Sequence, residues 1–346
     1  MGSGAWSDDA YRSSASGRKA FAFSDRVLSK PRKEQRCHQL LDPYGLKVRE
    51  SRDSAEHPES NAVITGLDVT GSMGSVVVAI RDDLGNLMGM LLGGTYISDP
   101  QLLFYAVGDA SPDESRENGM CDAIPFQISQ FESDIRINDQ ITKVVLEGNG
   151  GGQNTESYEL GFYMAARHTS IDCWEKRQRK GYLVTIGDEM PYPEVSRKEV
   201  KKIFNAALEK DIPLAQIVRE AQEKYHTFHI IPRGSSHYND PEIRNAWAKA
   251  LGGRQFVFML EDPAATAATI AVAIGLNEGA ITLADAVRAV AKGSGQATAQ
   301  VVEDTLKDFA AYAATQPKAR PTGKGRKKTD PKTDPNSSKD KKDWKL

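Results

Sequence analysis

Five oxygen-bearing side chains stand at points of the sequence where an apolar run or a loop ends. Asp68, Thr70 and Ser72 follow one apolar run, Thr155 follows a glycine-rich loop, and Asp188 follows a later apolar run. Hard cations such as Mg²⁺ prefer carboxylate and hydroxyl oxygens, in a six-coordinate shell that usually keeps several waters. The pattern therefore predicts a site for a divalent cation.

The spacing of these residues suits convergence on one ion. The first three alternate along a turn, where Gly71 and Gly74 permit tight backbone curvature. The glycine-rich loop over 148–155 can bring its final threonine across to them. Taken alone, the first three residues would equally indicate an Asx turn with capping hydroxyls. The later threonine and aspartate favour the metal site.

Apolar runs and helical periodicities alternate along the chain and would position these side chains. Strands are expected at 62–67, 102–107, 124–128, 182–186, 226–231 and 255–260, and helices at 77–91, 131–146, 156–168, 194–208, 213–225 and 241–251. This alternation predicts an α/β fold, a doubly wound and mostly parallel sheet with helices on both faces. In such sheets ligands bind at the carboxyl ends of the strands, where the five side chains are expected.

Composition divides the chain into four parts. We expect an extended N-terminal arm over 1–60 with a short helix interrupted by Pro31, the α/β domain over 61–276, an alanine-rich helical appendage over 277–316, and a disordered tail over 317–346. The tail carries 11 Lys and Arg against four Asp, although the whole chain has a net charge of -2. It could serve as an arm for nucleic acid or an acidic partner. Its aspartates dilute the positive field, which favours a solubilising role.

The sequence also bears on the cellular compartment. No apolar run approaches the roughly 18–20 residues that span a bilayer, and the N-terminus lacks the apolar core of a signal peptide. Cys37, Cys121 and Cys173 stand far apart, without the spacing of a zinc ribbon or a disulfide framework. We therefore expect a cytoplasmic protein with reduced thiols.

The run Asp68-Val-Thr-Gly-Ser-Met73, with Thr155 and Asp188 downstream, resembles the metal-ion-dependent adhesion site (MIDAS) of von Willebrand factor A (vWA) domains. The family pattern is Asp-x-Ser-x-Ser, and Thr70 keeps a hydroxyl where a serine is more usual. The resemblance covers about residues 61–262, and the chain is also similar to uncharacterised bacterial and phage proteins. It implies direct metal contacts from Ser72, Thr70 and Thr155, with the two aspartates acting largely through water.

Such a site would be a binding device. Neutral hydroxyls leave the cation incompletely neutralised, so that a partner's Glu or Asp can complete its shell. The bound ion would be Mg²⁺, or Mn²⁺ or Ca²⁺ in its place. Met73, Asn154, Glu189 and Tyr192 are expected at the rim that a partner contacts. The resemblance implies a non-enzymatic adaptor whose protein partner belongs to an AAA+ ATPase-linked or other multi-protein assembly.

Two other functions remain open at this stage. Asp68 could be the nucleophile of a Mg²⁺-dependent phosphohydrolase, but Thr70 replaces the second acid of that motif and no suitable Lys follows. The basic tail could bind nucleic acid. His226 and His229 would face opposite sides of a strand and are expected to be packed there, not to bind zinc. We also expect Asp109 and Glu132 to be solvated acids, and Tyr158 to be a core aromatic.

Overall fold

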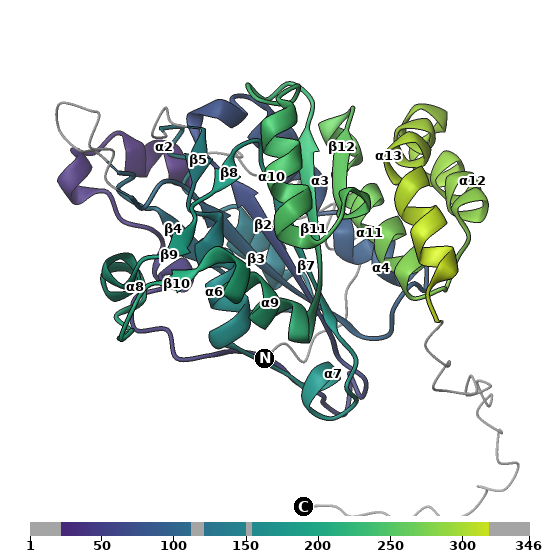
Figure 1. Ribbon diagram of the computed structural model, residues 1–346, viewed down its shortest axis with the longest axis horizontal. Coiled ribbons are helices and arrows are strands. Elements are labelled where there is room, and N and C mark those ends of the chain that lie inside the picture. Colours follow the sequence, from purple (N-terminus) through teal and green to yellow (C-terminus); the bar gives the residue numbers. More distant parts are fainter. Residues whose placement is uncertain (1–21, 112–120, 150–153, 318–346) are drawn as a thin grey trace, which may run out of the picture. The chain divides into compact units, whose positions relative to one another are not determined.

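A central six-stranded sheet organises the chain, which a computed structural model describes over residues 22–111, 121–149 and 154–317. The predictions for the first 21 residues and for the tail beyond Pro317 lie outside the described residues. In spatial order the sheet contains β12 (Val257–Leu260), β11 (Tyr225–Pro232), β7 (Gly181–Ile186), β2 (Asn61–Asp68), β3 (Pro100–Val107) and β4 (Phe126–Ile128). All neighbours are parallel except β4, which runs antiparallel to β3 (Figure 1). All six predicted strands are therefore confirmed.

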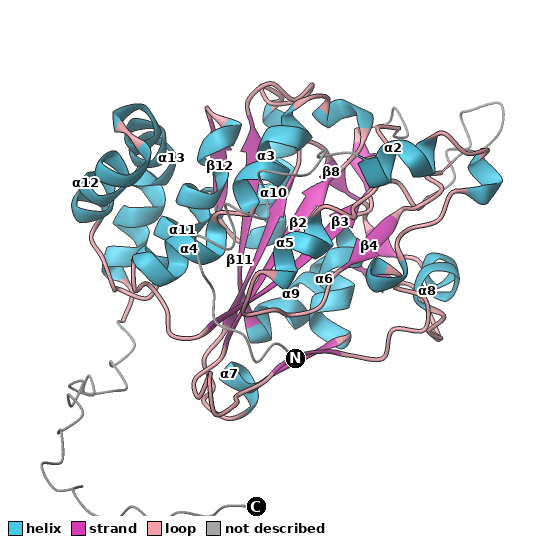
Figure 2. Cartoon of the chain, turned by 180° about the vertical axis from the view of Figure 1, so that it is seen from behind, coloured by secondary structure: helices cyan, strands magenta, loops and turns pink. Residues whose placement is uncertain are grey.

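Helices cover both faces of this sheet, as the α/β prediction requires. Figure 1 shows one face, covered by α6 (Tyr158–Arg167), α9 (Leu214–Lys224) and α10 (Pro241–Leu251), with α8 (Arg197–Phe204) beside them. Figure 2 shows the other, covered by α3 (Val76–Leu84), α4 (Leu87–Gly93), α5 (Arg136–Ile141) and α11 (Thr266–Asn277). The predicted doubly wound architecture is confirmed.

Side-chain alternation along the strands builds a separate core on each face. Val63 and Leu67 of β2 belong to the apolar cluster that includes α3 and α11, whereas Ala62 and Ile64 belong to the cluster that includes α6. Every residue of β2 is buried because both of its faces are covered. This burial explains why the strand reads as a continuous apolar run.

Two alanine-rich helices complete the described chain. They are α12 (Leu283–Ser294), which begins after its N-cap Thr282, and α13 (Gln296–Thr315). Phe309 of α13 is buried in the same apolar cluster as α3 and α11. The described residues up to Gln316 form one compact unit. The finer division into arm, domain and appendage stays a prediction.

Three predicted helices are shorter than expected. The helix predicted over 194–208 is reduced to α8, since Glu194 and Val195 form a short strand and Asn205 ends the helix in a left-handed conformation. The helix predicted over 77–91 is broken into α3 and α4 at Gly85 and Asn86, which are both poor helix formers. The helix predicted over 131–146 is reduced to α5. Its C-terminal part is extended because the Gln127 side chain hydrogen bonds to both the N–H and the carbonyl of Val145, at 2.9 Å each.

The N-terminal arm is less extended than predicted. It contains α2 (Ala22–Leu28), two short 3₁₀ turns and β1 (Arg49–Ser51), which pairs in parallel with β6 (Thr169–Ile171). The remaining short elements are α7 (Asp172–Glu175), β5 (Thr155–Glu156), β8 (Met190–Pro191), β9 (Glu194–Val195) and β10 (Ile212–Pro213).

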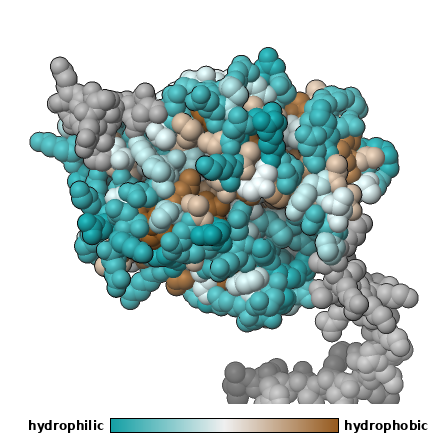
Figure 3. Space-filling model, viewed as in Figure 1, coloured by the Kyte–Doolittle hydropathy of each residue, from teal (hydrophilic) through white to brown (hydrophobic). Residues whose placement is uncertain are grey.

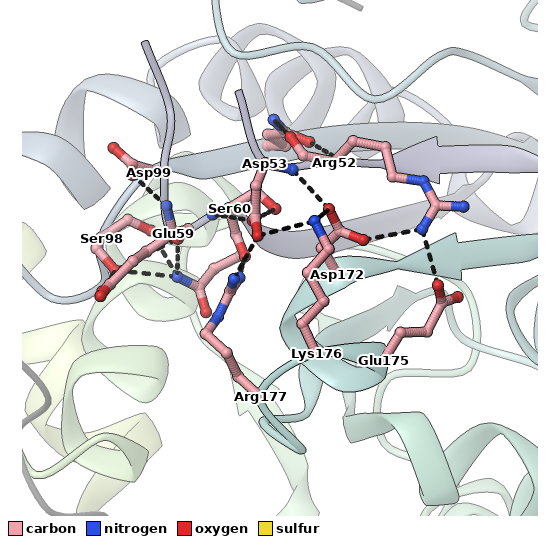
Figure 4. Close-up of polar contacts among 12 residues, drawn as sticks. Arg52, Asp53, Glu59, Ser60, Ser98, Asp99, Asp172, Glu175, Lys176 and Arg177 are labelled. Carbon is pink, nitrogen blue, oxygen red and sulfur yellow. Dashed lines mark hydrogen bonds and ion pairs between the residues drawn. The ribbon is translucent and has the colours of Figure 1, made fainter. Parts of the chain in front are cut away.

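A polar network joins the arm to α7 and to the residues that follow it (Figure 4). Arg52 donates to Asp172 at 2.9 Å, and the Asp53 carboxylate accepts from Arg177 at 2.7 Å and from the Ser60 hydroxyl at 2.8 Å. Although partial burial opposes the effect, the bonds from Arg177 and Ser60 lower the pKa of Asp53 to about 2. The network therefore stabilises the fold while this carboxylate is ionised.

The surface carries few large apolar side chains. Leu40, Tyr44, Val48 and Leu92 are the exposed large hydrophobics among the described residues. On the face drawn in Figure 3, hydrophilic residues predominate and hydrophobic ones form small separate areas. No helix of the described chain is both long and apolar enough to cross a bilayer.

Asp53→Asn should destabilise the protein by about 2 kcal/mol at pH 7, because it removes a charged acceptor from several hydrogen bonds. The folded pKa of Asp53 lies below the ordinary value of about 3.9, so its contribution is complete above that value and is lost as the pH falls towards 2. Urea unfolding at pH 7 and pH 3 measures this. The control is Asp308→Asn, exposed on α13. If Asp53→Asn lowers the free energy of unfolding by the same amount at pH 7 and at pH 3, the stabilising role of the ionised Asp53 carboxylate is contradicted.

Candidate metal centre

Three loops meet at the carboxyl ends of the central strands, at the upper edge of the sheet in Figure 1. Asp68 is the last residue of β2, and Asp188 lies two residues beyond the end of β7. The third loop follows β11, and its Ser236 N–H donates to the Ser72 carbonyl at 2.9 Å. The parallel sheet thus places the predicted residues at one edge.

A continuous chain of hydrogen bonds joins four of the five predicted metal ligands. Thr70 donates from its hydroxyl to Asp68 Oδ1 at 2.6 Å, and its Oγ1 lies 3.2 Å from Ser72 Oγ. Ser72 in turn donates to Asp188 Oδ1 at 2.7 Å. The loop after β2 therefore reaches the loop after β7 through side-chain oxygens alone.

The oxygen spacings suit a small octahedral cation. With metal–oxygen distances of about 2.1 Å, adjacent ligands of Mg²⁺ lie roughly 3.0 Å apart. The three oxygen–oxygen distances in the chain, between 2.6 and 3.2 Å, are ordinary hydrogen-bond distances that are also compatible with that spacing. The donor set, with two carboxylates and two hydroxyls, also suits a hard cation.

Thr155 approaches from the glycine-rich loop. It begins β5, where it pairs with Met190 of β8, two residues after Asp188. The start of the same loop packs against the turn after β2, because the Gly71 N–H donates to the Asn149 carbonyl. A Cβ at position 71 would lie 3.0 Å from the carbonyl oxygens of Gly148 and Asn149, so any other residue would require the two loops to move apart by a few tenths of an ångström.

Two residues that the sequence did not single out hold the aspartates in place. Tyr158, predicted only as a core aromatic, is indeed buried, and it also donates its hydroxyl to Asp68 Oδ2. The backbone N–H of His237 donates to Asp188 Oδ2 at 2.8 Å. No sequence signal marks a backbone donor, but a tyrosine that follows the predicted Thr155 by three residues could have been suspected.

The site concentrates buried carboxyl groups. Asp68 and Asp188 are both 0% exposed, and Glu156 and Glu189 are buried beside them. Burial, with the charges of Glu189 and Asp188, raises the pKa of Asp68 to about 8. Burial likewise raises the pKa of Glu189 to about 7, and burial with the charge of Asp68 raises that of Glu156 far above its usual range. A cation at this place would relieve the repulsion.

The carboxyl groups of Glu156 and Glu189 form a hydrogen bond with each other, which requires a proton on one of them. The described residues contain no group of three or more His, Cys, Asp or Glu side chains that could hold a metal. A cation at this edge would therefore depend on the hydroxyls of Thr70 and Ser72 as well as on the carboxylates. The residues present fit a divalent ion of that kind.

The predicted rim is only partly on the surface. Met73 is 0% exposed and packs in the core, so the prediction that it contacts a partner is wrong: the 3₁₀ turn over Gly71–Met73 points it inward. Glu189 is also buried. Asn154 is exposed, and half-buried Tyr192 donates its hydroxyl to Asp109 Oδ1 at 3.0 Å.

Two other expectations can be compared with the structure. Asp109 and Glu132 are 1% and 7% exposed, so the prediction of solvated acids is wrong. The backbone of Asp109 accepts from the Asp122 N–H at 2.7 Å, and that of Glu132 pairs with Leu102 of β3. His229 is fully buried and stacks on Trp247 with ring centroids 3.6 Å apart, as expected for a packed strand histidine.

No family model matches the sequence, and no curated protein matches it. Solved structures match in part. The pilus adhesin SpaC from Lactobacillus rhamnosus GG is 11% identical with a TM-score of 0.43, over 66% of this chain and 31% of its own. The vWF domain of the type V pili tip protein Mfa5 from Porphyromonas gingivalis is 12% identical with a TM-score of 0.40, over 62% and 95%.

This chain thus spans about a third of the SpaC chain that it resembles. Because the identities and the TM-scores are low, neither likeness carries an argument about what the chain does. The case for a metal site rests on the geometry of the oxygens.

Tyr158→Phe should weaken uptake of Mg²⁺ about tenfold, because outer-shell hydrogen bonds orient the groups that bind a metal. It should also cost about 1–2 kcal/mol of stability, since Asp68 loses a buried donor. Titration calorimetry and urea unfolding give the two values. Tyr225→Phe is the matched control, because its buried hydroxyl bonds Thr169 away from the site. Equal Mg²⁺ affinities in the two variants would contradict a positioning role for Tyr158.

Proposed function

We propose that the chain is a vWA-type protein that binds a divalent cation at a MIDAS and captures an acidic residue of a protein partner through it. The observation that carries this proposal is the hydrogen-bonded chain from Asp68 through Thr70 and Ser72 to Asp188. Thr155 would complete the ligand set from β5. Mg²⁺ is the ion that best suits these spacings, and Mn²⁺ or Ca²⁺ could replace it.

The bound ion would supply a positive centre that an external carboxylate can join. This chain's own residues orient that centre. Tyr158 and the His237 N–H fix the two aspartates, while Ser72 and Thr155 are half-buried. The mainly hydrophilic surface in Figure 3 suits a contact that depends on charge more than on apolar area.

Burial of Asp68 favours binding over catalysis. Its side chain is 0% exposed, and both carboxylate oxygens accept hydrogen bonds, one from Thr70 and one from Tyr158. A nucleophile must reach its substrate, so the phosphohydrolase alternative gains no support here. We therefore propose a non-enzymatic adaptor.

The setting of this adaptor is also part of the proposal. Cys37, Cys121 and Cys173 are free thiols in the described chain, which suits a reducing cytoplasm. We propose a partner in an AAA+ ATPase-linked or other multi-protein assembly, on the family resemblance alone. The nucleic-acid alternative depended on the basic tail, which lies outside the described residues.

Titration calorimetry tests the metal site directly. The full chain should take up one Mg²⁺ per molecule, and Ser72→Ala or Asp188→Asn should weaken uptake by at least about tenfold, since each removes an oxygen from the site. Ser294→Ala and Asp308→Asn, both exposed on the C-terminal helices, are the matched controls. Wild-type protein that is folded yet releases no heat with Mg²⁺, Mn²⁺ or Ca²⁺ would refute the proposal.

A further inference from the structure

A basic cavity lies beside the metal centre and plays no part in the site described so far. Its volume is about 640 Å³, and its lining includes Arg32, Lys33, Arg36 and Lys202, with Cys121 and Asp122. The cationic side chains come from segments far apart in the chain, because three belong to the N-terminal arm and Lys202 belongs to α8. The fold therefore gathers this charge around one hollow.

Most of that positive charge is uncompensated. Arg32 pairs with Glu147 at 3.4 Å, but Lys33, Arg36 and Lys202 form no ion pair within the described part of the chain, and all three are exposed. Arg36 donates to the backbone carbonyl of Lys33 at 2.9 Å, and Lys202 donates to Cys121 Sγ at 3.3 Å. These hydrogen-bond partners are neutral, but the charge of Lys202 also interacts with the carboxyl group of Glu199 on the same helix.

Two series of contacts connect this cavity with the metal edge. Glu147, the partner of Arg32, lies two residues before Asn149, whose carbonyl accepts from Gly71 in the metal loop. Asp122 accepts from the Asp109 N–H at 2.7 Å. Burial raises the pKa of the Asp122 carboxyl. The negative charges of Glu147, Asp109 and Asp68 raise it further.

A second hollow adjoins the predicted rim. It has a volume of about 510 Å³, and its lining includes Tyr192, two lysines (Lys198 and Lys202) and two glutamates (Glu194 and Glu199). Lys202 therefore belongs to both hollows. A ligand in extended conformation could contact the rim at Tyr192 and the basic cavity at once.

We propose that this basic cavity binds carboxylates of an acidic segment of the partner, whose further carboxylate reaches the metal centre. The inference rests on the proposed function and names the partner's chemistry. An acidic peptide offers separate carboxylates, one for the cation and others for the guanidinium and ammonium groups. A nucleic acid is the competing polyanion, and the experiment below distinguishes it from an acidic peptide.

Fluorescence anisotropy of the full chain with a labelled poly-glutamate peptide in the presence of Mg²⁺ tests this inference. The variant Lys33→Gln, Arg36→Gln, Lys202→Gln should bind the peptide about tenfold more weakly, since three ion pairs are lost. The matched control removes three exposed charges elsewhere, with Arg219→Gln, Lys249→Gln and Lys292→Gln. Circular dichroism shows that each variant is folded.

Equal affinities of the two triple variants would overturn the inference, as would equal binding of poly-glutamine. The inference would also be overturned, in favour of nucleic acid, if oligothymidylate bound more tightly than poly-glutamate and the cavity variant lost that binding. Calorimetry with Mg²⁺ separates the two proposals. If the cavity variant keeps both its Mg²⁺ uptake and its peptide affinity, only the inference about the cavity is refuted. If the wild-type chain takes up no Mg²⁺, the proposed function is refuted.

Discussion

A group of buried carboxyl side chains at one edge of the sheet is the constraint on which the rest of the structure depends. Asp68 and Asp188 are fully withdrawn from water, and Glu156 and Glu189 are buried close to them. A carboxylate in such a place is costly unless hydrogen bonds or a cation compensate it. Hydroxyls of Thr70, Ser72 and Tyr158, with backbone N–H groups, supply part of that compensation. A divalent ion would supply the remainder.

The parallel sheet is what makes this grouping of carboxyl side chains attainable. Strands β2, β7 and β11 lie side by side, so the loops that follow them all emerge at one edge. Two apolar cores, one on each face, fix the register of these strands and hence the position of every loop. At the strands' opposite ends, the network around Asp53 and Asp172 joins the N-terminal arm to the body (Figure 4). The arm then contributes Arg32, Lys33 and Arg36 near the metal edge.

Much of this arrangement was accessible from the sequence. All six strands were predicted because strands covered on both faces give apolar runs, and four predicted ligands could be placed because strand ends meet at one edge. The ends of the helices were harder to predict from the sequence. The Gln127 side chain, 18 residues away along the chain, hydrogen bonds to the backbone of Val145 and keeps it out of the predicted helix. The burial of Met73, Asp109 and Glu132 likewise depends on how loops fold back in space, which periodicity does not record. The backbone donor of His237 carries no side-chain signature at all.

Diffraction from crystals grown with Mn²⁺ would test the central claim most directly, because the anomalous signal locates that ion. We expect one strong peak about 2.2 Å from the hydroxyl oxygens of Ser72 and Thr70, with Thr155 turned towards it and the hydrogen bond between Ser72 and Asp188 rearranged. An anomalous map with no peak among these residues, in crystals whose loops keep the hydrogen bonds described above, would contradict the account.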